Sequence, residues 1–222
     1  MVECKIFVSA VCGKIRAMGS KFFITIGIVL VVAGLMLNYV RMQSSFVIQP
    51  PPASSVSVSN PQISCSSTPT VSETEGPYYK GGSPERTNLY DKNIPGTKFT
   101  LTGYVLDTNC NPKAHAWLDF WQADGNGHYD NSGYTLRGHQ YTDAQGKFTL
   151  VTVIPGEYPG RTPHIHVKVR ANSNSPILTT QLYIPGLTSN AQDSIYDPTL
   201  QMQKVNVSKD GTTATFTFII KK

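Results

Sequence analysis

The run KFTLTGYVLD, residues 98–107, has a texture that recurs through most of this chain, because apolar and β-branched residues alternate along it with small or polar ones. Such alternation is typical of a β-strand that buries one face. Similar runs, separated by Gly, Asn, Pro and Asp, are AWLDFWQAD (116–124), KFTLVTVIP (147–155), HIHVKVRA (164–171), ILTTQLYI (177–184) and ATFTFII (214–220). Six or more short strands with turn signals between them predict an all-β protein, an antiparallel β-sandwich.

The extent of the sandwich follows from the length and texture of the chain. Apolar residues make up 40% of the 222 residues and charged residues 15%, which is enough apolar material to bury one sizeable core. No apolar pattern of helical period competes with the strand-like runs after about residue 65. Asp210-Gly211, between two strand-like runs, predicts a β-hairpin. We therefore expect one domain at 65–222.

The N-terminal part of the chain has a different texture. Residues 22–40, FFITIGIVLVVAGLMLNYV, carry no charge and are long enough to span a bilayer as a helix. Four of the five Lys and Arg residues among the first 41 precede this span, so the positive-inside rule places 1–21 in the cytoplasm. The Ser- and Pro-rich stretch 41–64 predicts a flexible linker. The prediction is a membrane-anchored, extracytoplasmic domain; secretion after cleavage of a signal peptide is the alternative.

Charge and cysteine usage bear on partners and compartment. The net charge is +5, but five Lys and Arg against one Glu place +4 of it within the first 41 residues. The rest of the chain has no basic stripe, which argues against nucleic acid as a partner. Cys4 and Cys12 are expected as reduced thiols in the cytoplasm. Cys65 and Cys110 are an even pair available for a disulfide outside it, and two free thiols are the alternative.

The stretch YPGRTPHIH, residues 158–166, concentrates groups that can bind a metal ion. His164 and His166 lie two apart on an expected strand, so both imidazoles point to one face, although such a pair is more often a packing or surface feature. Tyr158 precedes them, and Tyr129 ends the run WQADGNGHY. A phenol has a pKa of about 10, so phenolate ligands require a strongly Lewis-acidic ion. Two imidazoles with hard, anionic oxygens suit Fe(III) better than Zn(II).

These blocks together resemble the intradiol ring-cleavage dioxygenases, which open catechols with non-haem ferric iron. The resemblance covers about residues 65–187. It rests on the order and spacing of TEGPYY (74–79), LTGYVLD, CNPKAHAWLDFWQADGNGHY, RGHQYTDAQGKFTLVTVIPGEYP, RTPHIHVKV and LTTQLYIPG. It implies a β-sandwich catalytic domain whose Fe(III) is held by Tyr129, Tyr158, His164 and His166. Tyr158 would be the ligand that leaves when substrate binds.

The resemblance also implies roles for other residues and an activity. Arg161 would face the substrate ring, Gln181 would be a pocket residue, and Pro77 with Tyr78 would line the pocket. The expected substrates are a catecholic aromatic diol and O2, and the expected product is a muconate-type diacid. The short YPGRTPH segment resembles a compact, exported branch of the family, in which cysteines placed as Cys65 and Cys110 are commonly paired.

Two other functions remain open at this point. One is a non-catalytic, transthyretin-like β-sandwich that binds a ligand, and the other is a hydrolytic zinc or copper site on the HIH strand. The remaining histidines, His139 among them, are expected at the surface or in hydrogen bonds. Arg137 is expected to brace a turn.

Overall fold

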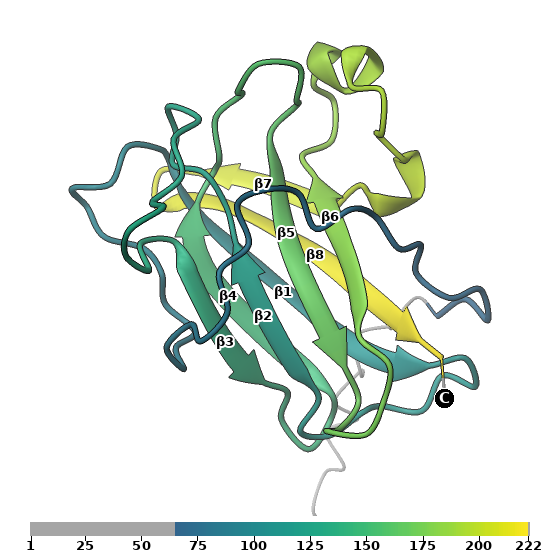
Figure 1. Cartoon of the computed structure of the whole chain (residues 1–222). Helices are drawn as coiled ribbons and strands as arrows, with labels where there is room; N and C mark the ends of the chain where they lie inside the picture. The colour runs from purple at the N-terminus through teal and green to yellow at the C-terminus, as the bar shows by residue number, and fades with distance from the viewer. Residues whose placement is uncertain (1–64, 222) are drawn as a thin grey trace, which may run out of the picture. The chain divides into compact units, whose positions relative to one another are not determined.

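The computed structural model describes residues 65–221, which form two four-stranded β-sheets packed face to face (Figure 1). The predicted cytoplasmic segment 1–21, membrane span 22–40 and linker 41–64, with Cys4 and Cys12, lie outside the described residues. Within the described part of the chain, no helix is long and apolar enough to cross a membrane.

The first sheet has the strand order β4-β1-β8-β7, and the second has the order β3-β2-β5-β6. Two short 3-10 helices lie in the connection between the sixth and seventh strands (Figure 1). The elements are β1 (Lys98–Asp107), β2 (Trp117–Trp121), β3 (Arg137–Tyr141), β4 (Lys147–Val153), β5 (His164–Arg170), β6 (Leu178–Tyr183), η1 (Thr188–Gln192), η2 (Pro198–Leu200), β7 (Gln203–Ser208) and β8 (Gly211–Ile220).

The sequence predicted most of these strands. The all-β class is confirmed, each of the six quoted runs overlaps a strand, and β1 coincides with its run at both ends. The predicted hairpin is also confirmed, because Ser208 pairs with Gly211 where β7 turns into β8. β3 was not predicted as a strand. It has the sequence RGHQY, whose charged, small and polar residues do not show an apolar alternation.

The prediction of a purely antiparallel sandwich is wrong for one pair of strands. β1 and β8 run parallel, from Phe99 opposite Thr212 to Asp107 opposite Ile220, whereas the other neighbouring strands pair antiparallel. The hairpin rule fixes direction only for strands joined by a tight turn. β1 and β8 lie at opposite ends of the domain sequence, so local patterns cannot set their relative direction.

The two faces of the second sheet have different surroundings. Leu118 on β2 and Ile165 and Val167 on β5 point into the core between the sheets and are fully buried. Because side chains alternate along a strand, the residues between them point to the outer face. The segment that follows the N-terminal end of the domain crosses this outer face in front of β2, β5 and β6 (Figure 1), where Tyr79 packs on Trp121.

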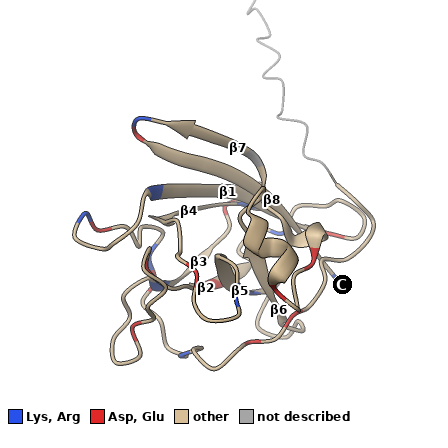
Figure 2. Cartoon of the chain, turned by 90° about the horizontal axis from the view of Figure 1, so that it is seen from above, with Lys and Arg blue, Asp and Glu red and all other residues tan. Residues whose placement is uncertain are grey.

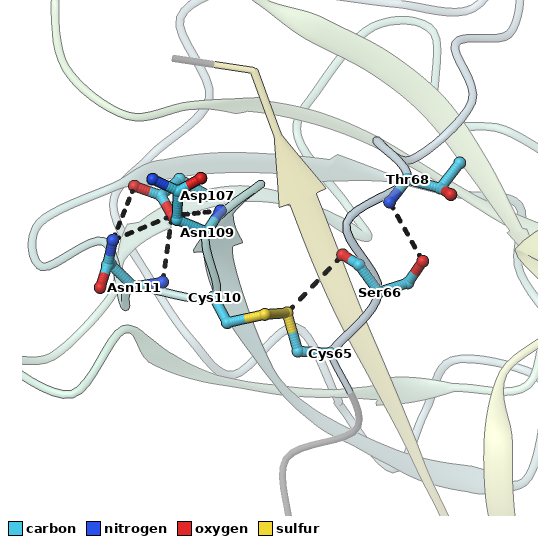
Figure 3. Close-up of a disulfide and its surroundings, with 7 residues drawn as sticks. All are labelled: Cys65, Ser66, Thr68, Asp107, Asn109, Cys110 and Asn111. Atoms are coloured by element: carbon cyan, nitrogen blue, oxygen red, sulfur yellow. Dashed lines mark hydrogen bonds between the residues drawn. A yellow bond between two sulfur atoms is a disulfide. The ribbon is translucent and has the colours of Figure 1, made fainter.

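The disulfide between Cys65 and Cys110 is present, with 5.9 Å between the two Cα atoms, which confirms the predicted pairing (Figure 3). Cys110 has a φ of 65° in the turn after β1. The carboxylate of Asp107 stabilises this turn by accepting hydrogen bonds from the backbone N–H groups of Asn109 and Asn111. The disulfide therefore ties the beginning of the described segment to the end of β1.

Charged residues are dispersed over this domain. Figure 2 shows Lys and Arg, and likewise Asp and Glu, as short separate segments that lie mostly in loops and at strand ends. Neither sign forms a continuous stripe within the described residues in that view. The electrostatics that matter are therefore local, between individual buried groups.

Candidate metal centre and active site

The candidate site lies on the outer face of the second sheet, at one end of its strands. The backbone pairing places Trp121 on β2 beside His166 on β5, and Arg137 on β3 and Gln181 on β6 complete the row. His164 is the first residue of β5 and points to the same side. The predicted histidine pair is thus on one face, and the two Nε2 atoms lie 3.1 Å apart.

Both histidines are in the state that binds metal ions. The Nδ1 of His164 lies 2.6 Å from the carbonyl oxygen of Thr162, so Nδ1 carries the proton and Nε2 has a free lone pair. Burial, followed by the charge of Arg161, lowers the pKa of His164 to about 4. Burial and the neighbouring His164 lower the pKa of His166 well below its ordinary value. Both imidazoles are therefore neutral at pH 7.

The distance between the two nitrogens fits two arrangements. Because the proton of His164 is on Nδ1, its Nε2 is an acceptor, so the Nε2 of His166 either donates an N–H to it or, in the other tautomer, shares one cation with it. Metal–imidazole bonds are about 2.1 Å long, so two nitrogens bound at a right angle to one ion lie about 3 Å apart. The observed 3.1 Å matches this value.

Two tyrosines complete a circuit of four rings. The ring centroids of His164 and His166 are 4.7 Å apart, those of Tyr158 and His164 5.6 Å, those of Tyr129 and Tyr158 5.8 Å, and those of Tyr129 and His166 6.3 Å. All four predicted ligands therefore come together, although they come from three separate segments. Within residues 65–221, no three His, Cys, Asp or Glu side chains are grouped so that they could hold a metal ion.

The hydroxyl of Tyr129 supports a ligand role. It is buried and has no hydrogen-bond partner among the described residues, which is uncommon for a buried polar atom. Burial, followed by the charge of Tyr158, raises the pKa of Tyr129, and burial also raises the pKa of Tyr158. Both groups are thus neutral phenols, and only a strongly Lewis-acidic cation would deprotonate them. Two phenols and two neutral imidazoles fit a hard trivalent ion such as Fe(III).

The loops that carry the two tyrosines are packed directly against each other. Gly127 has a φ of +82°, and a Cβ atom there would lie 2.1 Å from the carbonyl oxygen of Glu157, so only glycine allows this approach. The N–H of Gly156 donates to the carbonyl oxygen of Asp124 at 2.8 Å. These contacts hold Tyr129 and Tyr158 on adjacent backbones.

Arg161 occupies one side of the site and contacts three side chains. Its NH1 donates to the hydroxyl of Tyr158 at 3.3 Å, its NH2 donates to Oε1 of Gln181, and its Nε donates to Asp193 at 2.9 Å. Burial works to lower the pKa of Arg161, but the hydrogen bond to Asp193 and the nearby Tyr158 outweigh it and raise that pKa. Arg161 and Gln181 are therefore hydrogen-bonded to each other, as a permanent cation and its neutral partner.

The segment predicted to line the pocket lies over the tyrosines. Tyr78 stacks on Tyr129 with 4.3 Å between centroids and meets Tyr158 edge-on at 6.0 Å. Pro77 is exposed beside it. Arg137 is buried and donates to the carbonyl oxygens of Asp130 and Tyr78, so it braces a turn as predicted and also holds the pocket segment.

The sequence of this domain matches the model of a protein family described as Dioxygenase over residues 74–220. Those residues contain all four rings and the segment over them. The chain belongs to the intradiol ring-cleavage dioxygenase family.

Curated relatives of this intradiol dioxygenase family member include the beta chain of protocatechuate 3,4-dioxygenase from Burkholderia cepacia. The two sequences are 31% identical over 121 residues, which are 47% of this chain and 52% of the relative. Chlorocatechol 1,2-dioxygenase from Rhodococcus opacus is 28% identical over 147 residues, which are 53% of this chain and 57% of the relative. The chain thus spans about half the length of the curated relatives that it matches.

Two solved structures resemble the domain over most of their own length. The dioxygenase domain of a dioxygenase and carbohydrate-binding protein fusion from Streptomyces sp. SirexAA-E is 48% identical, with a TM-score of 0.67 over 69% of this chain and 99% of that one. An intradiol ring-cleavage dioxygenase from Tetranychus urticae is 26% identical, with a TM-score of 0.63 over 71% and 95% of the two chains.

Sequence reasoning missed several residues around the candidate site. Trp121 stacks on His166 with 4.7 Å between centroids and 7° between planes. The alternation of the WLDFW run could have placed Trp121 on the outer face, but not on a particular imidazole. Asp193, which binds Arg161, lies in an irregular loop outside the quoted blocks, so no signal in the sequence pointed to it.

Proposed function

We propose that this chain is a non-haem, Fe(III)-dependent enzyme that uses O2 to cleave catecholic diols between their two hydroxyl-bearing carbons, giving muconate-type diacids. The observation that carries the proposal is the closed circuit of two neutral imidazoles and two phenols, with two Nε2 atoms 3.1 Å apart. The names of the relatives, which include catechol, chlorocatechol and hydroxyquinol 1,2-dioxygenases, support a vicinal aromatic diol as substrate.

In this proposal Tyr129, Tyr158, His164 and His166 are the iron ligands. When bound, ferric iron would supply the Lewis acidity that allows a catechol to bind as its dianion. The raised pKa values of the two phenols mean that each gives up its proton only in exchange for a strong positive charge. A weakly acidic ion would leave the phenols protonated, so the donor set itself selects a strong Lewis acid.

Tyr158 is the proposed base. Ferric iron would hold Tyr158 as a phenolate, and a phenolate not bound to a cation would readily accept a proton from a substrate hydroxyl, because burial raises the pKa of Tyr158. The NH1 of Arg161 donates to this oxygen at 3.3 Å, which would hold it beside the site. One residue thus serves first as a ligand and then as a proton acceptor.

Arg161 is the proposed electrostatic catalyst. Its planar, permanently charged guanidinium can stabilise negative charge that develops on the substrate ring. Gln181 supports it, because the Oε1 of Gln181 accepts from Arg161 while its Nε2 donates to the carbonyl oxygen of Thr74 at 3.0 Å. Tyr78 and Pro77 would line the substrate pocket over Tyr129 and shield the reacting centre from water.

We also propose that the enzyme acts outside the cytoplasm, held at a membrane by residues 22–40 through the linker 41–64. The uncharged span and the basic residues before it support this location. The disulfide between Cys65 and Cys110 is compatible with an oxidising compartment. Fractionation of cells that express the full chain would test it, since a secreted form would be found in the medium with a trimmed N-terminus.

The function is tested by loading the purified protein with ferric iron. We expect a visible tyrosinate-to-iron absorption, uptake of O2 with one member of a panel of catechol, hydroxyquinol and protocatechuate, and a diacid product. Colourless protein that consumes no O2 would favour a binding module. Hydrolytic activity restored by zinc or copper would favour the other alternative.

Tyr158→Phe separates metal binding from proton transfer. Three ligands remain, so the variant should keep part of its iron, while loss of the proton acceptor should lower turnover about 10²- to 10⁴-fold. Iron content and O2 uptake are measured on the same sample. Unchanged turnover in a fully metallated variant would remove Tyr158 from the mechanism.

A further inference from the structure

Asp193 is a buried carboxylate that lies just after η1, in the connection between β6 and β7. Its side chain is 0% exposed, and its two oxygens accept three N–H groups. The donors are the Nε of Arg161 at 2.9 Å, the backbone N of Thr162 at 3.1 Å and the backbone N of Ile195 at 3.1 Å. Every contact that the structure gives this carboxylate is thus with a donor, and one of these donors is a cation.

The first effect of Asp193 is on the orientation of Arg161. A guanidinium carries five N–H donors in one plane. Asp193 takes the Nε donor, which leaves the two terminal nitrogens for Tyr158 and Gln181. Three acceptors from three different segments therefore determine where the plane lies. Asp193 is the only acceptor of the three that carries a carboxylate charge, so it contributes the strongest of these contacts.

Asp193 also binds the backbone of the segment that follows Arg161. The carboxylate holds the backbone N of Thr162, and the carbonyl oxygen of Thr162 faces the Nδ1 of His164 at 2.6 Å. The side chain of Thr162 donates to Asn190, whose amide in turn donates to the carbonyl oxygen of Ile184, the residue after β6. The same short connection thus fixes the segment that carries both the cation and the first imidazole.

The charge balance explains why a carboxylate is found there. The Arg161 side chain is 16% exposed, and a largely buried guanidinium needs a counter-charge, because an uncompensated buried cation is strongly destabilising. Burial alone would raise the pKa of Asp193, but the hydrogen bonds from Arg161 and the two backbone N–H groups outweigh it and lower that pKa. The pair therefore stays ionised at neutral pH, and Arg161 remains in place without using its terminal nitrogens.

We propose that Asp193 is a positioning residue for the ring-cleavage reaction, acting through Arg161. The inference rests on the proposed function. Among the described residues, Asp193 has no hydrogen bond to any of the four rings, so its proposed effect on the reaction passes through Arg161. Its role is to hold the guanidinium at the angle at which the terminal nitrogens can face the bound ring.

The central variant is Asp193→Asn, which keeps the shape and removes the charge. An amide has one acceptor oxygen where the carboxylate has two, so at least one of the three N–H donors then faces an NH2 group. We expect kcat to fall about 10- to 100-fold, with KM changed less than threefold, because misplacement by about 1 Å is enough for such losses. Iron content and the visible absorption of the resting protein should stay as in the wild type.

Asp197→Asn is the matched control. Asp197 lies on the same connection, and its carboxylate accepts from the backbone N and the hydroxyl of Thr199 at the beginning of η2. It has no hydrogen bond to Arg161 among the described residues. The variant should therefore keep wild-type kcat, even if it loses some stability. Equal kcat values for Asp193→Asn and Asp197→Asn would overturn the proposal.

A double-mutant cycle separates positioning from a general structural role. If Asp193 acts through Arg161, then adding Asp193→Asn to Arg161→Lys should lower kcat less than twofold further. Fully multiplicative losses would contradict the inference. A spectroscopic measurement complements it: the absorption of the catechol complex formed without O2 should differ between Asp193→Asn and the wild type, while Asp197→Asn matches the wild type.

Two further cases need their own measurements: a variant that does not fold, and a failure of the proposed function itself. If Asp193→Asn does not fold, Asp193→Glu keeps the charge but moves it by one methylene group, and kcat should then fall about three- to tenfold in folded, iron-loaded protein. Wild-type kcat in that variant would count against the proposal. Wild-type protein that binds iron but cleaves no diol would refute the proposed function, whereas an active wild type with an equally active Asp193→Asn refutes only the role of Asp193.

Discussion

The two faces of the second sheet are both buried, but they are built in opposite ways. The inner face buries Leu118, Phe120 and Ile165 among other apolar side chains of the core. The outer face buries Arg137 and His166 together with a phenol and an indole that have hydrogen-bonding atoms without partners. Buried polar atoms without partners cost stability. The inner face is therefore mostly apolar, with Gln140 and Thr180 as its buried polar exceptions, whereas the outer face gathers ionisable and aromatic side chains around the candidate site.

Of the substitutions that test this difference between the two faces, Phe120→Ala on the inner face should have the largest effect, and that effect is on the free energy of unfolding. Phe120 is 0% exposed and packs 5.8 Å from Phe148 between ring centroids, so its truncation should lower the free energy of unfolding by about 3–5 kcal/mol. Chemical denaturation measures the change. Val207→Ala is the matched control, because Val207 is 76% exposed, and its effect should stay within about 0.5 kcal/mol. A small effect of Phe120→Ala would mean that the core does not carry the stability.

Arg161→Lys on the outer face should affect the reaction and leave iron binding intact. Lysine keeps the charge but cannot reproduce the planar fork that reaches Tyr158, Gln181 and Asp193 at once. Loss of a preorganised donor typically lowers turnover about 10²-fold. O2 uptake and iron analysis on the same sample check both parts. Near-normal O2 uptake would show that charge alone is sufficient at this position.

Tyr129→Phe tests whether a proposed iron ligand on the outer face lowers the stability of the iron-free protein. The variant removes a buried hydroxyl that has no partner among the described residues, so the iron-free protein should become more stable by about 1–2 kcal/mol. The same variant should lose a ligand, and with it iron content and visible absorption. Unfolding of the iron-free wild type and variant is compared by denaturation. A destabilised iron-free variant would show that the hydroxyl is satisfied in solution.

The smallest effect is expected from Asp130→Asn, in the turn beside Tyr129, and it should appear as a change in how stability depends on pH. Hydrogen bonds from the backbone N–H groups of Gly133 and Thr135 lower the pKa of Asp130 below its unfolded value of about 3.9. A carboxyl group with a lowered folded pKa contributes stability that is present above its unfolded pKa and is lost as the pH falls toward its folded pKa. Asp130→Asn should thus destabilise the protein at pH 7 and progressively less below about pH 4. A pH-independent difference between the two proteins would contradict this assignment.

Much of the fold and part of the site could be predicted from local patterns. The limits of β1 followed from its alternation, and the common face of His164 and His166 followed from their spacing of two. The strand β3 was missed because its residues RGHQY include Arg137 and Gln140, which are buried polar residues. Hydrophobic patterns identify strands that bury apolar side chains, and they fail where a strand buries polar ones.

The sequence by itself determined which side chains share a face, since the twofold period of a strand is a property of neighbouring residues. It also supplied the four rings, because their blocks resemble those of a known family. Only the tertiary structure decided the parallel pairing of β1 with β8, the stacking of Trp121 on His166 and the bond from Arg161 to Asp193. These contacts join segments that are distant in the chain, and their geometry depends on how the two sheets and their loops pack, which no local pattern contains.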